Sequence, residues 1–436
     1  MKKRLFISLI CIFSTILCFA DRITVGNFCY DITLGSSEAS LVENNSNEYS
    51  GDVVIPSSFT YQGKEYQVTK IGANAFYCCL NLTSVKIPDG VNEIGDGAFT
   101  YDVKIKSIAI PNSVEKMGNG VFCGCSILER IVLEKGNKHF VFKDNMLFSA
   151  DGKILYQVLQ ITENLVVPEG VTEIKDEAVS MCSELTSVSL PSSLTYIGKK
   201  AFFNVFKMRS ISIPQNVSYI GEAAFGSCNS YLEISLEGNN SFYKMENGIL
   251  LSKDGSLLLH TSRNIDDVVS IPNTVVRIGA WALSEHANEK LVVPDNVQTI
   301  GEYAFLNLIH LSSITLGSSI KEIEQCAFWG CYNITSFVLR ATTPPATSNV
   351  KFSTEQLEAT LVVPKGCLNV YKNSTYDWSK FANIVEGDVT GVDSVINSSD
   401  NTPTTIYDAN GMKRQSLSKG LNIIRMANGS IKKVLK

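Results

Sequence analysis

Hydrophobic and polar positions along the chain repeat with a period of 23 residues. Residues 87–109, 110–132, 190–212 and 213–235 all follow the pattern IPxxVxxIGxxAFxxCxxLxxVx. The LxxVxI part alternates apolar and polar positions and predicts a half-buried strand, which the proline ends because it has no N–H for a ladder. The VxxIGxxAFxxC part spaces its apolar residues by three and four, which predicts a short helical or tightly turned segment. Neither segment can bury its apolar side alone, so the units must stack on one another.

A period of 20–29 residues with this apolar spacing is typical of leucine-rich repeats. We therefore predict an α/β solenoid: a leucine-rich-repeat superhelix of about nine 23-residue units with two hairpin-like inserts, β-rich caps and a small β C-terminal module. The phenylalanines of the units should form an internal stack. The Ala-Phe positions of the units are Ala75-Phe76, Ala98-Phe99, Val121-Phe122, Ala178-Val179, Ala201-Phe202, Ala224-Phe225, Ala282-Leu283, Ala304-Phe305 and Ala327-Phe328.

A glycine precedes the Ala-Phe pair in most units. Such a position indicates either a turn that favours positive φ or a close approach of two backbones. Lys175 and Glu324 occupy it in two units, so glycine is not obligatory there. The glycines at this position are Gly72, Gly95, Gly118, Gly198, Gly221, Gly279 and Gly301.

Two inserts, at 135–166 and 237–268, interrupt the period. They resemble each other in the segments NKHFVFKDNMLFSADGKILY and NNSFYKMENGILLSKDGSLLLH. Each contains an Asp-Gly pair between apolar runs, at Asp151-Gly152 and Asp254-Gly255, which predicts a hairpin turn. A calcium loop of the EF-hand type is disfavoured because it needs several acidic residues at alternate positions. We expect the aromatic residues of the inserts to cover the solenoid.

The ends of the chain depart from the repeat. We predict an N-terminal β cap at 21–52 and a solenoid over 53–388 whose C-terminal cap occupies 341–388. A polar linker follows at 389–404, and 405–436 form a small β tail with many basic residues and turn signals at Asn410-Gly411 and Asn428-Gly429.

The first 20 residues have the composition of a secretory signal peptide. Lys2-Lys3-Arg4 precede an apolar run from Leu5 to Leu17, and Cys18-Phe19-Ala20 follow, which predicts cleavage near Ala20. The run is too short to span a bilayer, and no other apolar stretch is long enough for a membrane helix. We therefore predict an extracellular or outer-surface location. Lipidation at Cys18 is the alternative that the sequence leaves open.

The net charge and the positions of the cysteines argue against a nucleic-acid-binding protein and against disulfide bonds between the repeat units. With 38 basic and 43 acidic residues the net charge is −5, so the chain has no global nucleic-acid signature. Equivalent sites in adjacent units lie about 4.8 Å apart, so cysteines two units apart are beyond disulfide reach. We predict that the cysteines at the shared core site are reduced and buried. These are Cys79, Cys125, Cys182, Cys228 and Cys331.

The sequence contains no recognisable catalytic or metal-binding constellation. It has only four histidines and no HExxH, paired CxxC or P-loop motif. Cys123 and Cys125 with His139 fit no zinc class by their spacing. We therefore predict no catalytic residues, no metal site and no cofactor, and hence no enzyme.

The units IPDGVNEIGDGAF, IPQNVSYIGEAAFGSC and LGSSIKEIEQCAFWGC resemble the BspA-type leucine-rich repeat, common in surface and secreted proteins of anaerobic bacteria. The inserts and the closing ATTPP…LVVPKG segment are similar to those that accompany these repeats, so the resemblance covers about residues 21–388. The tail IYDANGMKRQSLSKGLNIIRMANGSIKKVLK resembles the C-terminal sorting domains of type IX secretion cargo. Members of the repeat family are implicated in adhesion, so the resemblance implies extracellular binding but brings no residue-level site.

The outward side of the LxxVxI strands is the candidate binding face. Its strands should together give a face roughly 40 Å long, enough for a protein partner. The face is rich in hydroxyls and nearly free of aromatic residues, and a plain strand ladder would explain the serines equally well. Its candidate residues are Ser84, Lys86, Ser107, Arg130, Ser187, Ser189, Ser210, Ser212, Glu233, Ser235, Ser313, Thr315 and Ser336.

Two functional hypotheses follow. The first is an exported, non-enzymatic binding or adhesion protein that presents its repeat surface to a protein or cell-surface partner. The second is a structural component of the cell envelope or extracellular matrix that associates with itself through the neutral serine-rich sheet or the solenoid ends.

Overall fold

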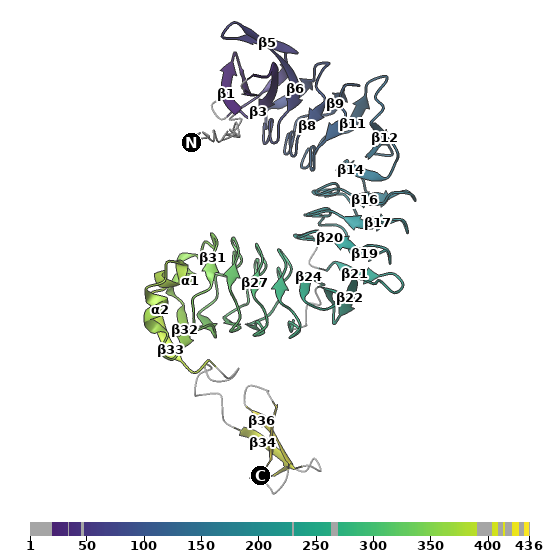
Figure 1. The fold of residues 1–436 in the computed structure, drawn as a ribbon. Helices are drawn as coiled ribbons and strands as arrows, with labels where there is room; N and C mark the ends of the chain where they lie inside the picture. The colour runs from purple at the N-terminus through teal and green to yellow at the C-terminus, as the bar shows by residue number, and fades with distance from the viewer. Residues whose placement is uncertain are drawn as a thin grey trace, which may run out of the picture.

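A computed structural model describes residues 20–389, apart from residue 34 and residues 45–47, 229–230 and 263–268, together with the strands of the segment 403–435. All but the last residue of the predicted signal peptide at 1–20 and most of the linker at 389–404 lie outside these residues. Figure 1 shows the units following one another along an open arc, with the short strands β8, β16 and β20 on its inner side.

Each unit contributes one long strand from its LxxVxI segment. The long strands are β4 (Gly51–Val54), β7 (Leu82–Lys86), β9 (Ser107–Ile110), β11 (Arg130–Leu133), β15 (Asn164–Val166), β17 (Ser187–Ser189), β19 (Ser210–Ile213), β21 (Glu233–Leu236), β26 (Lys290–Val292), β28 (Ser313–Leu316) and β30 (Ser336–Leu339). They pair in parallel with the apolar residues in register, as in Ile211 beside Ile234. These side chains point inward and are buried.

A second, two-residue strand follows in each unit, just before the glycine position. The short strands are β8 (Glu93–Ile94), β10 (Lys116–Met117), β16 (Glu173–Ile174), β18 (Tyr196–Ile197), β20 (Tyr219–Ile220), β25 (Arg277–Ile278), β27 (Thr299–Ile300), β29 (Glu322–Ile323) and β31 (Ala346–Thr347). They too pair in parallel, with Ile174, Ile197 and Ile220 in one file. The segment after each short strand is tightly turned, and the helices of the described chain all lie in the C-terminal cap. The repeat solenoid is confirmed.

The phenylalanines form the predicted internal stack. The rings of Phe76 and Phe99 lie 5.0 Å apart and nearly parallel, and Phe122 continues the file at 5.7 Å from Phe99. Further stacked pairs join Phe202 to Phe225 and Phe305 to Phe328. Offset-stacked aromatic rings contribute stabilising free energy beyond that of the apolar area that they bury. The stack is interrupted where Val179 and Leu283 take the phenylalanine position.

Close backbone approach explains the glycine that lies three residues before the Ala-Phe pair in most units. A Cβ added to Gly118 would lie 2.4 Å from the backbone nitrogen of Asp96, and one added to Gly95 would lie 2.6 Å from that of Ala73. The left-handed conformation occurs two residues later instead, for example at Gly97, where φ is 61°, and Glu177, also 61°. Of the two explanations left open by the sequence, close approach therefore applies at this position.

The core cysteines are buried and carry free thiols, as predicted. The Cys125 thiol donates to the carbonyl oxygen of Phe99 at 3.0 Å, and that of Cys331 donates to Phe305 at 2.9 Å. In both cases the acceptor belongs to the preceding unit. Burial raises the pKa of the Cys228 and Cys331 thiols to about 12. These thiols therefore act as small core side chains with a weak donor.

Asp102 takes the cysteine position in one unit and is fully buried. Its Oδ1 accepts a hydrogen bond from the backbone N–H of Cys79 at 2.9 Å, while Oδ2 has no hydrogen-bond partner. Desolvation by burial, reinforced by the charge of Glu48, raises the pKa of this carboxyl to about 8, although the Cys79 N–H opposes the shift. The N-terminal part of the solenoid therefore contains a carboxyl that is costly to ionise.

Each insert folds as an antiparallel three-stranded meander whose last strand joins the short-strand ladder. The first contains β12 (Phe140–Lys143), β13 (Met146–Ser149) and β14 (Ile154–Val158), and the second contains β22 (Tyr243–Glu246), β23 (Ile249–Ser252) and β24 (Leu257–Thr261). The Asp-Gly pairs lie between β13 and β14 and between β23 and β24, which confirms the predicted turns. β14 pairs with β16, and β24 pairs with β25.

Equivalent asparagines attach the two inserts to the units before them. Asn137 Nδ2 donates to the carbonyl of Pro111 at 3.1 Å, and Asn240 Nδ2 donates to that of Pro214 at 3.3 Å. Tyr243 adds a contact in which its hydroxyl accepts from the backbone N–H of Ile220 at 2.8 Å. The insert thus satisfies a backbone group of the preceding unit, and the buried ring covers the core as predicted.

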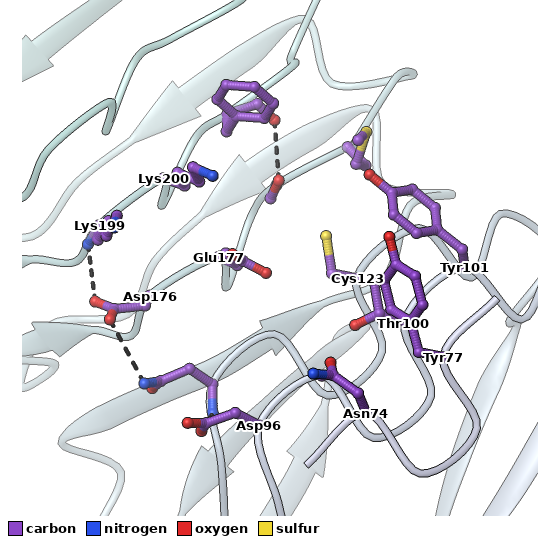
Figure 2. A pocket seen from close by; sticks show the side chains of 15 residues that line it. Asn74, Tyr77, Asp96, Thr100, Tyr101, Cys123, Asp176, Glu177, Lys199 and Lys200 are labelled. Atoms are coloured by element: carbon purple, nitrogen blue, oxygen red, sulfur yellow. Dashed lines mark hydrogen bonds between the residues drawn. The ribbon is translucent and has the colours of Figure 1, made fainter. Parts of the chain in front are cut away.

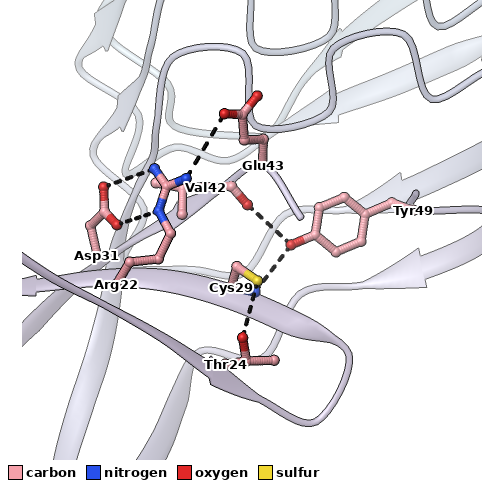
Figure 3. Close-up of polar contacts among 7 residues, drawn as sticks. All are labelled: Arg22, Thr24, Cys29, Asp31, Val42, Glu43 and Tyr49. Carbon is pink, nitrogen blue, oxygen red and sulfur yellow. Dashed lines mark hydrogen bonds and ion pairs between the residues drawn. The ribbon is translucent and has the colours of Figure 1, made fainter. Parts of the chain in front are cut away.

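A strand-rich region covers the N-terminal end. It contains β1 (Ala20–Val25), β2 (Phe28–Thr33), β3 (Glu38–Val42), β5 (Ser58–Tyr61) and β6 (Lys64–Ile71), in the order β1-β2-β3-β6 with β5 on β6. Figure 3 shows Tyr49 at its centre, donating to the Val42 carbonyl at 3.1 Å and accepting from the Cys29 N–H at 3.3 Å. Arg22 forms an ion pair with Asp31 at 3.0 Å on its surface.

An aromatic cap covers the C-terminal end. Its elements are α1 (Thr354–Glu358), β32 (Thr360–Pro364), α2 (Leu368–Lys372), η1 (Asp377–Lys380) and β33 (Asn383–Gly387). Trp378 and Tyr371 are fully buried, and each donates to a backbone carbonyl, Pro345 at 2.9 Å and Ala341 at 2.7 Å. Gln356 Nε2 donates to the Phe328 carbonyl at 2.8 Å, which ties the cap to the last turn.

The tail forms a four-stranded antiparallel sheet in the order β35-β34-β36-β37. Its strands are β34 (Pro403–Asp408), β35 (Lys413–Arg414), β36 (Leu421–Met426) and β37 (Ile431–Leu435). This agrees with the small β module that the sequence predicts. The domain boundaries themselves stay predictions.

Replacing Asp102 by Asn should stabilise the protein at and above neutral pH. The folded-state pKa lies above the unfolded value of about 3.9, so the contribution of this carboxyl to stability is fully present below pH about 4 and is lost as pH rises through about 8. Asp102→Asn keeps an acceptor for the Cys79 N–H but cannot ionise, and we expect a gain on the order of 4 kcal/mol at pH 8. Urea unfolding at pH 5 and pH 8.5 measures the difference. The exposed Asp89→Asn change is the control, and an unchanged pH dependence in Asp102→Asn would contradict the assignment.

Candidate binding surface

The candidate residues from the sequence lie on the outward side of the long strands. The exposed members are Ser84, Lys86, Ser107, Arg130, Ser187, Ser189, Ser210, Glu233 and Ser235, and the half-buried members are Ser212, Ser313, Thr315 and Ser336. Strand pairing aligns Ser107 with Arg130 and Ser210 with Glu233. We call this surface the strand face. Whether it binds a partner stays a prediction.

The strand face is less continuous than the sequence suggests. The long strands form separate ladders. The inserts divide them between β11 and β15 and between β21 and β26, and two further breaks without an insert lie between β7 and β9 and between β17 and β19. Some of its hydroxyls are also engaged within the solenoid, as where Ser84 Oγ donates to Asp52 at 2.6 Å. At the C-terminal end Val389 packs on Val338 and Val362 and covers part of the face. The predicted single face of roughly 40 Å is therefore divided.

A second surface is formed by the turns that follow the short strands, and we call it the turn surface. Backbone hydrogen bonds link successive turns, as from Phe76 N–H to the Ala98 carbonyl at 2.8 Å and from Phe305 N–H to the Ala327 carbonyl at 2.9 Å. A left-handed residue precedes each inward Ala-Phe pair, so the side chains on either side of the pair project outward.

The turn surface holds aromatic residues that the sequence reasoning missed. Trp281 and Tyr303 precede the Ala-Phe position, while Tyr77, Phe203 and Trp329 follow it. Tyr77 and Trp329 are 50% and 46% exposed. These positions vary from unit to unit and carry no periodic signal. The only clue in the sequence was that large aromatics recur at positions outside the consensus.

The inserts create two equivalent junctions on the turn surface. The first lies between the turns at 118–125 and 175–182, and the second between those at 221–228 and 279–286. Their equivalence follows from strand register, because β14 pairs with Glu173 and Ile174 in the same way as β24 pairs with Arg277 and Ile278. Glu177 at the first junction therefore corresponds to Trp281 at the second, and both have a φ of 61°.

The second junction is filled by Trp281. Its ring lies 4.9 Å from that of Phe203, edge to face, and 4.7 Å from that of Tyr303. Arg277 reinforces the junction, since its Nη1 lies 2.8 Å from Glu324 Oε1 and its Nη2 pairs with Glu222 across the insert. These charge-assisted contacts raise the pKa of Arg277 and tie the two parts of the solenoid together, although desolvation opposes the shift.

The first junction instead contains a hollow of about 420 Å³. Figure 2 shows Tyr77, Tyr101 and Cys123 on one side of it and Asp176, Glu177 and Lys200 on the other. The hollow is lined by Asn74, Tyr77, Asp96, Gly97, Thr100, Tyr101, Asn119, Cys123, Asp176, Glu177, Ser180, Met181, Lys199, Lys200 and Phe203. It lies within the size range of small-ligand pockets.

Hydrogen bonds fix the polar groups of the hollow. Asp176 Oδ1 accepts from the Lys199 N–H at 2.8 Å, and its Oδ2 accepts from Asn119 Nδ2 at 3.5 Å. The Asn119 N–H in turn donates to Asp96 Oδ1 at 2.7 Å. Desolvation raises the pKa of the Glu177 carboxyl, and it raises the pKa of Tyr101 to about 12. The hollow thus combines oriented donors and acceptors with aromatic rings.

The Cys123 thiol lines the hollow but is itself buried, and desolvation raises its pKa to about 12. Cys125 faces the core, whereas His139 is exposed on the first insert. Among the residues that the structure describes, no group of three or more His, Cys, Asp and Glu side chains could hold a metal ion.

Within the same residues, no helix has the length and apolar character needed to cross a membrane.

Comparison with known proteins identifies the repeat. Residues 57–150, 152–250 and 260–381 match the BspA type leucine rich repeat region, in 6 copies. The chain belongs to the BspA-type leucine-rich-repeat family. This confirms the resemblance seen in the units, while the likeness of the tail to type IX sorting domains stays a prediction. No curated protein matches this BspA-type chain.

Several solved structures are similar to this BspA-type protein. A leucine-rich cell surface protein from Faecalibacterium prausnitzii is 27% identical, with 84% of this chain and 95% of that chain covered and a TM-score of 0.47. The pneumococcal vaccine antigen PcpA is 15% identical, with 85% and 99% covered and a TM-score of 0.35. A leucine-rich-repeat protein from Bacteroides ovatus is 21% identical, with 84% and 90% covered and a TM-score of 0.31.

Truncating the two tryptophans of the turn surface should have unequal effects on stability. Trp281→Ala removes the ring contacts with Phe203 and Tyr303, and we expect it to cost about 2–3 kcal/mol. Trp329 is 46% exposed, so Trp329→Ala should change stability by less than about 0.5 kcal/mol. Urea unfolding of both variants measures the difference. Equal losses would show that Trp329 is part of the packing and is not available to a partner.

Proposed function

We propose that this BspA-type protein is an exported, non-enzymatic binding protein that attaches to a protein or cell-surface partner through its turn surface. The observation that carries the proposal is the exposed aromatic character of this surface, above all Trp329 and Tyr77. Interface hot spots are enriched in Trp, Tyr and Arg, and serines are under-represented among them. The strand face offers mainly serines, with Arg130 as its one arginine among the candidate residues.

Membership of the repeat family supports a binding role, since solenoids of this kind present extended surfaces. The signal-peptide-like N-terminus supports export to the extracellular space or the outer surface. Self-association as an envelope or matrix component is the second candidate, favoured by the same exposed aromatics, because an apolar surface can also accept a second copy.

A binding screen of the purified full chain tests the proposal. Saturable binding to one or more extracellular-matrix proteins, epithelial cells or bacterial cells is expected. In the Trp329→Ala variant the dissociation constant should rise by about 30-fold, the effect of a hot-spot residue. The matched control is Arg130→Ala on the strand face, which should change it less than about twofold.

If Arg130→Ala weakened binding much more than Trp329→Ala did, the binding surface would be the strand face. Absence of saturable binding to every probe would contradict the binding function. If light scattering then showed concentration-dependent oligomers that Trp329→Ala abolishes, self-association would replace it.

We also propose that the tail acts as an export address and is dispensable for the solenoid. Among the residues that the structure describes, its strands pair only with one another, and the solenoid already ends in a cap built on Trp378 and Tyr371. Deleting 390–436 should therefore leave the melting temperature of the solenoid nearly unchanged, because independent units contribute additively. In the native host the truncated protein should remain in the periplasm. Normal surface display of the truncated protein, measured by labelling intact cells, would rule the address out.

A further inference from the structure

We infer that the hollow at the first junction binds the end of a carbohydrate chain. The inference rests on the proposed binding function and names the ligand class for one part of the turn surface. The two junctions of the turn surface have equivalent backbones, but different side chains occupy them.

At the second junction an indole fills the space between the turns. At the first, Glu177 replaces Trp281, Thr100 replaces Phe203 and Cys123 replaces Gly226. The Glu177 carboxylate folds back over Gly120, where an added Cβ would lie 2.4 Å from its Oε2. The first junction therefore stays open and is lined by polar groups, although its backbone follows the same path.

The lining suits a ligand that carries many hydroxyls and an apolar ring face. Sugar hydroxyls both donate and accept hydrogen bonds, and the hollow offers both kinds of partner. Its acceptors are the carboxylates of Asp96, Asp176 and Glu177, and its donors include Lys199 and Lys200. Tyr77 and Tyr101 form an edge-to-face pair at 5.8 Å on the opposite wall, where an aromatic ring can cover the C–H face of a pyranose.

The same lining disfavours other small ligands. The three carboxylates in and around the hollow outnumber its two lysines, which disfavours a phosphate or another anion. The described residues include no group of three or more metal-ligating side chains, so the acids do not form a cation site. An apolar ligand would leave the charged wall without partners, which is costly. A neutral ligand with many hydroxyls can form hydrogen bonds with the polar wall and place its apolar ring face on the tyrosines of the opposite wall.

The polar wall is also held in place before any ligand arrives. Asp176 is fixed by the Lys199 N–H and by Asn119, and Ser180 Oγ donates to the Phe203 carbonyl at 3.2 Å. Groups that are already oriented lose little entropy on binding, which favours recognition by a small site.

Saturation-transfer NMR on the purified full chain tests the inference. The probes are glucose, galactose, mannose, fucose, N-acetylglucosamine and N-acetylgalactosamine, followed by an array of neutral oligosaccharides that end in them. At least one probe should bind. Asp176→Asn and Tyr77→Ala should each weaken it by about tenfold, the loss expected for one hydrogen-bonding or stacking partner. Inorganic phosphate should not compete.

The decisive variant is Glu177→Trp, which introduces at the first junction the residue that fills the second. Trp281 has the same φ of 61°, so the backbone accepts an indole there, and circular dichroism confirms the fold. This variant should lose carbohydrate binding. The control Tyr332→Ala removes an aromatic side chain that is 53% exposed and does not line the hollow, and it should bind normally.

Carbohydrate binding that survives Glu177→Trp would place the sugar elsewhere and overturn the inference. Failure of every saccharide to bind the native protein would overturn the ligand class. The proposed function fails separately, because its test depends on Trp329, which does not line the hollow. Adhesion that is sensitive to Trp329→Ala but not to Glu177→Trp would keep the function and reject the carbohydrate site.

Discussion

Backbone hydrogen bonds between neighbouring units, repeated every 23 residues, are the constraint on which the rest of this structure depends. They run through the long strands, the short strands and the turns, and each places a residue beside its equivalent in the next unit. An inward position can therefore become a file of like side chains, such as the stacked phenylalanines, whereas the core cysteines alternate with other residues such as Asp102 and Val205. The close approach at Gly95 and Gly118 is the steric consequence of the same ladders.

The inserts show how far this constraint can be relaxed. Each ends in a strand that re-enters the short-strand ladder, and Asn137 and Asn240 attach its start to the unit before it. Each insert contributes buried residues to the core clusters on both of its sides, while the long-strand and short-strand ladders are both divided there. The turns on the two sides come together without a shared backbone ladder, so side chains decide what fills the space between them. Trp281 fills one such space, and Glu177 leaves the other open.

The sequence predicts the features that the period enforces. The solenoid, the phenylalanine stack, the buried thiols and the Asp-Gly turns all follow from positions that recur in every unit or in both inserts. The turn surface could not be predicted in this way, because Tyr77, Trp281 and Trp329 occupy positions where the consensus is free. The hollow needs still more information, since it joins segments that are separated by the whole first insert. The continuity of the strand face was overestimated because the repeat pattern shows which residues form strands but not which neighbouring strands are hydrogen-bonded to each other.

The chain leaves the solenoid at a fixed point, and this determines how mechanical load would enter it. Arg340 Nε donates to the carbonyl of Val389 at 3.0 Å, while Val389 packs on Val338 and Val362. Tension applied through the tail reaches this clasp first and then β33, which pairs in parallel with β32. Unravelling from this end would therefore have to break the arginine clasp and the contacts of the aromatic cap before it reached the first repeat strand. The cap thus stands between a pull on the tail and the peeling of the repeats, however many repeats the solenoid contains.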